Sequence, residues 1–189
     1  MNDKYWIGDV YYIMLKGEEK RNILADECEK KKILDILDNL KKQKDFRVIS
    51  YCVLDYQVEF IIDAYSGLLK GIIDKLIVEY TESYNALNNT RKVGVLKSCY
   101  FAKLNGIKEI MDTGIQMHIR PLHDSIVKNV EDYWWSSYRS YQKILGRGAS
   151  ILNILDGEAL LRNIDIDKKK ALRIFMRLHK EKLGINKKD

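Results

Sequence analysis

Two polar side chains interrupt an apolar run at positions where they could hold a metal ion. Gln57 and Glu59 flank Val58 at the start of a short apolar segment. Because side chains alternate along a strand, both residues point to the same face of a sheet, as two ligands of one ion require. Their amide and carboxylate oxygens would hold Mg²⁺ or Mn²⁺ weakly. The simpler interpretation is a pair of polar residues on an exposed strand face that need no function. In another alternative, Glu59 pairs with Arg120.

Histidine and cysteine show no comparable pattern. His118 and His123 are five residues apart across Pro121, which is poor geometry for shared ligation. We interpret them as surface histidines or as histidines whose hydrogen bonds are satisfied inside the protein. The three cysteines lie far apart, with no CxxC motif and no Cys/His pairing. We therefore expect reduced thiols without a chemical role, and neither a zinc site nor a disulfide framework.

An aromatic segment ending in basic residues could contact nucleic acid. Trp134, Trp135, Tyr138 and Tyr141 could stack on unpaired bases, with Arg139 on a phosphate. Aromatic side chains bury much apolar area, however, and we favour core packing for this group.

Two C-terminal helices, expected at 157–163 and 167–183, form a second basic segment. A turn of about three residues separates them, and the second helix is rich in lysine and arginine, as in a helix-turn-helix reader. The turn lacks the usual glycine. A solvated basic face is therefore the favoured interpretation.

Net charge and hydropathy limit the partners and the location. The formal net charge is +6 and the pI is near 9.0, which favours polyanionic partners such as nucleic acid. The sequence has neither an apolar run long enough for a membrane span nor a signal-peptide pattern, so we expect a cytoplasmic protein without a membrane partner. Hydrophobic residues make up 46% of the 189 residues, which is typical of one main folded domain.

Strand and helix patterns alternate along the chain. Runs of β-branched, aromatic and aliphatic residues predict strands at 10–16, 46–54, 58–62 and 94–102. Apolar residues spaced by three and four predict earlier helices at 26–44, 66–85 and 106–119. Asp26 is placed to cap the first helix, and Pro121 is expected to end the third.

The order strand, helix, strand, strand, helix, strand is that of a ferredoxin-like fold. We therefore predict an α+β protein: an antiparallel sheet with helices packed on one face, plus C-terminal helices. We place the main domain at residues 1–145 and a C-terminal helical extension at 146–189. Many functions use such a fold, so the order of elements does not choose among them.

Several segments together resemble one protein family over most of the chain. They are YYIMLKGEEKRNIL (11–24), FRVISYCVL (46–54), the segment 80–96, IRPLHDSIV (119–127) and DYWWSSYRSY (132–141). They are similar to the transposases associated with repetitive extragenic palindromes (REP), a branch of the single-tyrosine HUH transposases. The most specific block is Trp-Ser-Ser-Tyr-Arg at 135–139, about a dozen residues after a proline. The resemblance implies a role in DNA transposition, with single-stranded or hairpin DNA as partner, and allows a homodimer.

The residues that the family uses for cleavage are replaced in this sequence. Family members cut DNA with a tyrosine hydroxyl, helped by a metal ion on a His-hydrophobic-His strand and a polar residue one helical turn after the tyrosine. Here Gln57-Val58-Glu59 stands at the histidine positions, Gln116 at the tyrosine and Arg120 at the helper position. Tyr100 stands where a basic residue is usual. The resemblance thus implies a degenerate member with no intact catalytic residue, because an amide cannot form a phosphotyrosine bond.

Three hypotheses of function follow. The leading one is a transposase-like DNA-binding protein that is catalytically inactive, needs no cofactor, and contacts phosphates through Arg21, Lys92, Arg120 and Arg139. The second is a metal-dependent nuclease in which Gln57 and Glu59 position a weakly bound Mg²⁺ or Mn²⁺ that activates water. The third is a structural or protein-interaction role without nucleic acid.

Overall fold

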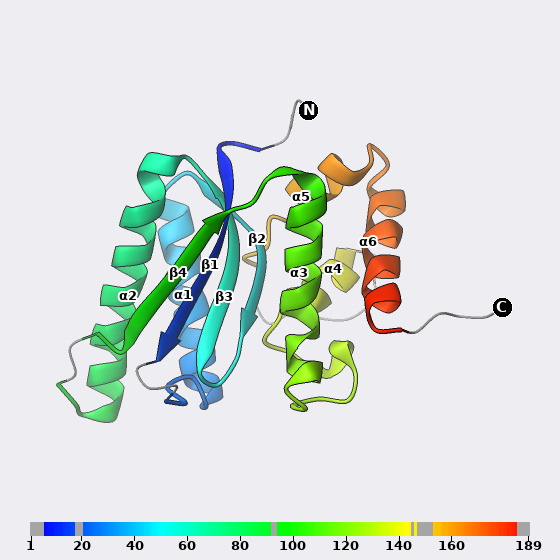
Figure 1. Cartoon of the computed structure of the whole chain (residues 1–189). Coiled ribbons are helices and arrows are strands. Elements are labelled where there is room, and N and C mark those ends of the chain that lie inside the picture. The colour runs from blue at the N-terminus through cyan, green and yellow to red at the C-terminus, as the bar shows by residue number, and fades with distance from the viewer. Residues whose placement is uncertain (1–5, 18–20, 92–93, 145, 147–152, 185–189) are drawn as a thin grey trace.

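A four-stranded antiparallel sheet forms the centre of the protein (Figure 1). The computed structural model describes residues 6–17, 21–91, 94–144, 146 and 153–184. The strands are β1 (Asp9–Gly17), β2 (Phe46–Val53), β3 (Gln57–Ala64) and β4 (Leu96–Lys103), in the order β2-β3-β1-β4. All three strand pairs are antiparallel. This is the ferredoxin-like arrangement, so the predicted α+β class and antiparallel sheet are confirmed.

Two helices, α1 (Glu27–Gln43) and α2 (Ser66–Asn88), pack on one face of the sheet. The predicted apolar stripe of α1 is buried, and the Asp26 side chain accepts a hydrogen bond from Cys28 N at 2.7 Å, as predicted for the cap. On this side, Leu69 and Ile73 of α2 line a pocket with Tyr11 and Phe101 of the sheet.

A third helix, α3 (Gly106–His123), covers part of the opposite face. Gly114 on α3 faces Ile61 of β3 and Ser50 of β2. The prediction that Pro121 ends this helix is wrong, because α3 continues to His123. A proline in the last turn removes only its own N–H from the helix, and Asp124 N still donates to Arg120 O at 2.8 Å.

The C-terminal part of the chain packs on the α3 side of the sheet. It contains a 3₁₀ turn, η2 (Val130–Asp132), and the helices α4 (Tyr138–Ile144), α5 (Gly157–Ile164) and α6 (Lys168–Lys182). α5 contacts β2, and α6 contacts α3. Buried residues from both sides of the predicted boundary at 145/146 belong to one hydrophobic core. The sequence patterns predicted α5 and α6 but not α4, which is short.

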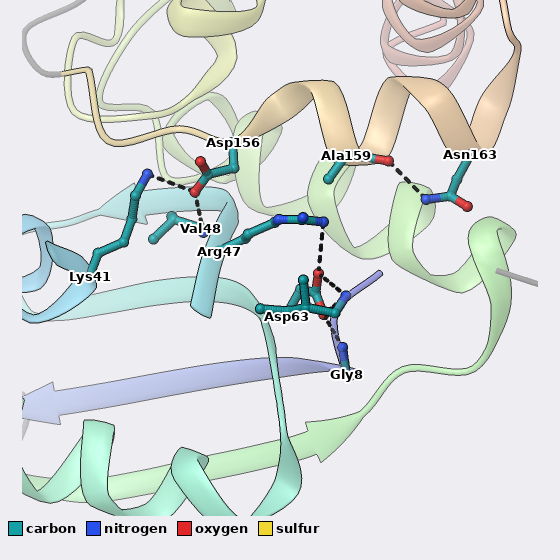
Figure 2. Close-up of polar contacts among 9 residues, drawn as sticks. Gly8, Lys41, Arg47, Val48, Asp63, Asp156, Ala159 and Asn163 are labelled. Atoms are coloured by element: carbon teal, nitrogen blue, oxygen red, sulfur yellow. Dashed lines mark hydrogen bonds and ion pairs between the residues drawn. The ribbon is translucent and has the colours of Figure 1, made fainter. Parts of the chain in front are cut away.

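Segments after α3 cover the outer edge of β2. Val53 N donates to Trp135 O at 2.9 Å, and Ser137 N donates to Tyr51 O at the same distance. Further along the strand, Asp156 accepts hydrogen bonds from Lys41 Nζ at 2.7 Å and Val48 N at 2.9 Å (Figure 2). These contacts protect an edge that would otherwise expose unpaired backbone groups. The opposite edge strand is β4.

A buried aspartate holds the start of β1 against the sheet. The Asp63 carboxylate accepts hydrogen bonds from Ile7 N and Gly8 N, each at 3.0 Å, and lies 3.6 Å from Arg47 Nη1 (Figure 2).

Among the described residues, no helix combines the length and apolarity needed to cross a membrane.

Candidate nucleic-acid interface

β3 places Gln57 and Glu59 on the face of the sheet that α3 covers. Glu59 pairs with Met14 of β1 and Cys52 of β2, two residues along from Ile61, which contacts α3. Gln57 is 2% exposed and Glu59 is fully buried. The interpretation of an exposed polar strand face is therefore wrong, because the sequence pattern of one strand does not reveal the helix that packs over it.

Arg120 of α3 meets the carboxylate of Glu59. Its Nε lies 3.0 Å from Glu59 Oε1, and Gln57 Nε2 donates a hydrogen bond to the same oxygen at 2.5 Å. The alternative that Glu59 pairs with Arg120 is thus confirmed. One carboxylate oxygen receives both an amide and a guanidinium group, and the three side chains form a closed cluster that we call the Glu59 cluster.

The Glu59 cluster is incompletely hydrogen-bonded. Within the described residues, Glu59 Oε2 has no hydrogen-bond partner, and Arg120 Nε–H does not point well enough at Oε1 to form one despite the short distance. Burial raises the pKa of Glu59, and the positive charge of Arg120 opposes this shift. Charge attraction therefore contributes more to this contact than hydrogen-bond geometry does.

The residues of the Glu59 cluster do not fit the divalent cation that the sequence resemblance implies. A cation here would have one carboxylate and one amide as ligands and would lie beside a guanidinium group, whose charge repels it. The described residues contain no group of three or more His, Cys, Asp or Glu side chains with metal-binding geometry. Arg120 already supplies the positive charge beside this carboxylate.

Gln116 lies one helical turn before Arg120 on α3 and is half-buried. Its amide offers no hydroxyl nucleophile. Two half-buried phenols lie close to the Glu59 cluster, Tyr12 and Tyr56. Burial raises the pKa of both, and the negative charge of Glu59 raises that of Tyr12 further, while Tyr56 donates to Asp124 Oδ2 at 3.1 Å. Neither phenol is set up to ionise and attack phosphorus.

His118 belongs to a fully buried network rather than to a surface site. Its Nδ1 lies 2.9 Å from His179 Nε2, and its Nε2 lies 2.7 Å from Ser137 Oγ and 3.0 Å from Ser50 Oγ. His179 Nδ1 donates to Phe175 O at 2.8 Å, which makes His118 Nδ1 the donor between the rings and His118 Nε2 an acceptor from serine. His118 is thus a satisfied core histidine, whereas His123 is exposed.

Sequence reasoning gave His179 no role. The partners His118 and His179 are 61 positions apart on different helices. The sequence did contain one signal for His179, because its spacing places it on the buried stripe of α6 with Ala171, Leu172 and Phe175.

The aromatic segment divides between core and surface. Trp135, Tyr138 and Tyr141 are buried, so the favoured core interpretation is confirmed for these three. Trp134 is 45% exposed, and the Arg139 guanidinium lies 3.4 Å from the centre of its ring. Arg139 Nη1 also donates to Glu131 O at 2.7 Å. The Trp134–Arg139 pair therefore forms a cationic and aromatic surface feature.

The structure describes one of the two remaining predicted phosphate contacts. Arg21 is exposed in the segment before α1, whereas Lys92 lies outside the described residues.

On α6, lysines and arginines form surface ion pairs, including Lys170 with Asp165 at 2.6 Å and Arg177 with Glu181 at 3.3 Å. Such contacts are typical of the solvated basic face that we favoured.

Comparison with solved structures defines the class of fold. This chain is similar to a structure of a REP-associated tyrosine transposase bound to a REP hairpin. The structural match covers 74% of this chain and 83% of that chain, with a TM-score of 0.56 and 13% sequence identity. A candidate transposase from Deinococcus radiodurans R1 matches 58% of this chain and 89% of that chain, also at 13% identity, but its TM-score of 0.45 is too low to define a shared fold. The sequence matches no protein-family model and no curated protein.

The protein therefore has a transposase-like fold. The resemblance found in the sequence agrees with the architecture of the REP-associated structure. At 13% identity this similarity describes the fold and not the activity.

Proposed function

We propose that this chain binds single-stranded or hairpin DNA and does not cleave it. The fold is similar to that of a transposase bound to a DNA hairpin, and the chain carries a net charge of +6. A positive protein attracts DNA through its phosphates, with release of counterions. Such binding requires no cofactor.

The observation that carries this proposal is the contact between Arg120 and Glu59. A guanidinium 3.0 Å from the buried carboxylate supplies the positive charge that a cleaving enzyme takes from a metal ion. One turn earlier on the same helix, Gln116 presents an amide at the position that the family resemblance gives to the nucleophile. The cluster is thus compatible with holding a phosphate and incompatible with a phosphotyrosine intermediate.

The phosphate contacts of this proposal are Arg21, Arg120, Arg139 and Lys92. The Arg120 side chain is 36% exposed, so part of it reaches the surface while its Nε lies against Glu59. Arg139 is held against Trp134, which limits the side-chain entropy lost on binding.

Fluorescence anisotropy with a labelled DNA hairpin at several salt concentrations tests the proposal. We expect the logarithm of the binding constant to fall with the logarithm of salt concentration, by about 0.7 per phosphate contacted on a single strand. The hairpin should bind more tightly than a blunt duplex of the same length. A salt-independent signal with no preference for the hairpin would contradict the proposal.

A further inference from the structure

The half of the sheet formed by β1 and β4 presents a face beside the Glu59 cluster over which no described helix packs. Alternation places Tyr12, Met14 and Lys16 of β1 on the same face as Glu59, and Tyr100 of β4 pairs with Met14 on that face. α3 packs against β2 and β3, and β4 lies at the other end of the sheet (Figure 1).

On β1, the residues of this face are more exposed than those of the opposite face. Tyr100 is 55% exposed, and Tyr12, Met14 and Lys16 are half-buried. Ile13 and Leu15, which point to the helix-covered side of the same strand, are 1% and 0% exposed. At 55% exposure, the ring of Tyr100 is open to solvent and accessible to a partner.

The two tyrosines form an ordered aromatic pair. The ring centres of Tyr12 and Tyr100 lie 6.1 Å apart at 61°, an edge-to-face arrangement. Burial raises the pKa of Tyr12 and the negative charge of Glu59 raises it further, so the inner ring lies next to the Glu59 cluster. The inner ring in turn restrains Tyr100, whose exposed surface is available to a flat partner.

The charges at the border of this face suit a nucleic-acid strand. Lys16 lies on the face itself, and the half-exposed Arg120 lies beyond Glu59. The carboxylate of Glu59 is buried and paired to Arg120, so it presents no exposed negative charge. Aromatic side chains that stack on bases, next to cations that contact phosphates, are the elements of single-strand binding on a four-stranded sheet.

We propose that unpaired DNA bases bind on this face, with one base stacked on Tyr100 and the adjoining phosphates next to Lys16 and Arg120. This inference rests on the proposed DNA binding and adds where the single strand lies.

Neighbouring residues of β4 provide a matched test. Tyr100 and Phe101 are both exposed aromatics, at 55% and 59%, but they point to opposite faces of the same strand. The ligands are a DNA hairpin with a single-stranded thymidine tail and the same hairpin without the tail. We expect Tyr100→Ala to weaken binding of the tailed hairpin about tenfold and to leave the tailless hairpin unchanged. Phe101→Ala should change neither affinity, and Tyr100→Phe should bind as the wild type, because stacking needs the ring and not the hydroxyl.

The outcomes separate the two proposals. If wild-type protein binds neither hairpin, both proposals fail. If it prefers the tailed hairpin but Tyr100→Ala and Tyr100→Leu do so equally, the stacking site is wrong while DNA binding stands. Loss of self-association in Tyr100→Ala, without loss of tail affinity, would identify the face as an interface between two copies and would also overturn the inference. Tyr100→Leu keeps an apolar side chain and provides the same test if the alanine variant is poorly folded.

Discussion

Arg120 on α3 and Glu59 on β3 form an ion pair at 3.0 Å in which the Glu59 side chain is fully buried and the Arg120 side chain is 36% exposed. This contact joins the helix to the centre of the sheet at the point where the sequence resemblance implies a metal site. It gives the position a structural role, because a buried carboxylate without its cation is costly.

We expect Arg120→Ala to lower the free energy of unfolding by about 2 to 4 kcal/mol, because it leaves the Glu59 charge buried and unpaired. Urea unfolding measures the change. Arg177→Ala is the matched control, since it removes an exposed arginine from a surface ion pair and should cost about 0.5 kcal/mol or less. The double substitution Glu59→Gln with Arg120→Gln should recover part of the loss. A loss in Arg120→Ala no larger than the control would show that the pair does not stabilise the fold.

The buried histidines predict a fall in stability at acid pH. Burial lowers the pKa of His118 well below its usual range and that of His179 to about 4. An unfolded histidine has a pKa of about 6.5, so below that pH the unfolded chain binds protons that the folded chain does not. The stability that neutral His179 contributes is therefore complete above about pH 6.5 and is lost as the pH falls toward 4, with a slope approaching about 1.4 kcal/mol per pH unit.

The variant His179→Gln isolates this effect. Its free energy of unfolding should depend less on pH than that of the wild type between about pH 6.5 and about pH 5. Comparing the two proteins cancels Glu59 and Asp63, whose raised pKa values act in the opposite direction. His123→Gln serves as control because His123 is exposed. Equal pH dependence in wild type and His179→Gln would mean that His179 is not held neutral in the folded state.

The fold could largely be predicted from local patterns. Strand runs and the helical stripes of α1 and α2 carry their own periodicity, and Asp26 precedes its helix as a cap should. Pro121 misled the prediction, because local rules do not say whether a helix stops at a proline or takes it into its last turn.

The candidate site was predicted less completely, because its geometry depends on long-range packing. The burial of Glu59 follows from α3 crossing the sheet, and nothing within β3 itself reveals that. His118 and His179 meet only because α6 packs on α3. The aromatic segment shows the same limit, since its composition does not distinguish exposed Trp134 from buried Trp135.

Introducing the cleavage residues that the sequence resemblance implies should confer some cleavage activity. The combined variant Gln57→His, Glu59→His, Gln116→Tyr and Arg120→Asn removes the guanidinium and supplies two imidazoles and a phenol. We expect partial nicking of a DNA hairpin in the presence of Mn²⁺. The same variant with Gln116→Phe in place of Gln116→Tyr is the control and should not nick. A folded four-residue variant without activity would show that these positions do not form a cleavage site.

The most direct test of the central claim follows a labelled DNA hairpin incubated with the wild-type protein and Mn²⁺. We predict a complex on a native gel, and intact DNA with no protein attached on a denaturing gel. A covalent protein–DNA adduct or a cleaved strand, above all one that Glu59→Ala abolishes, would contradict the claim.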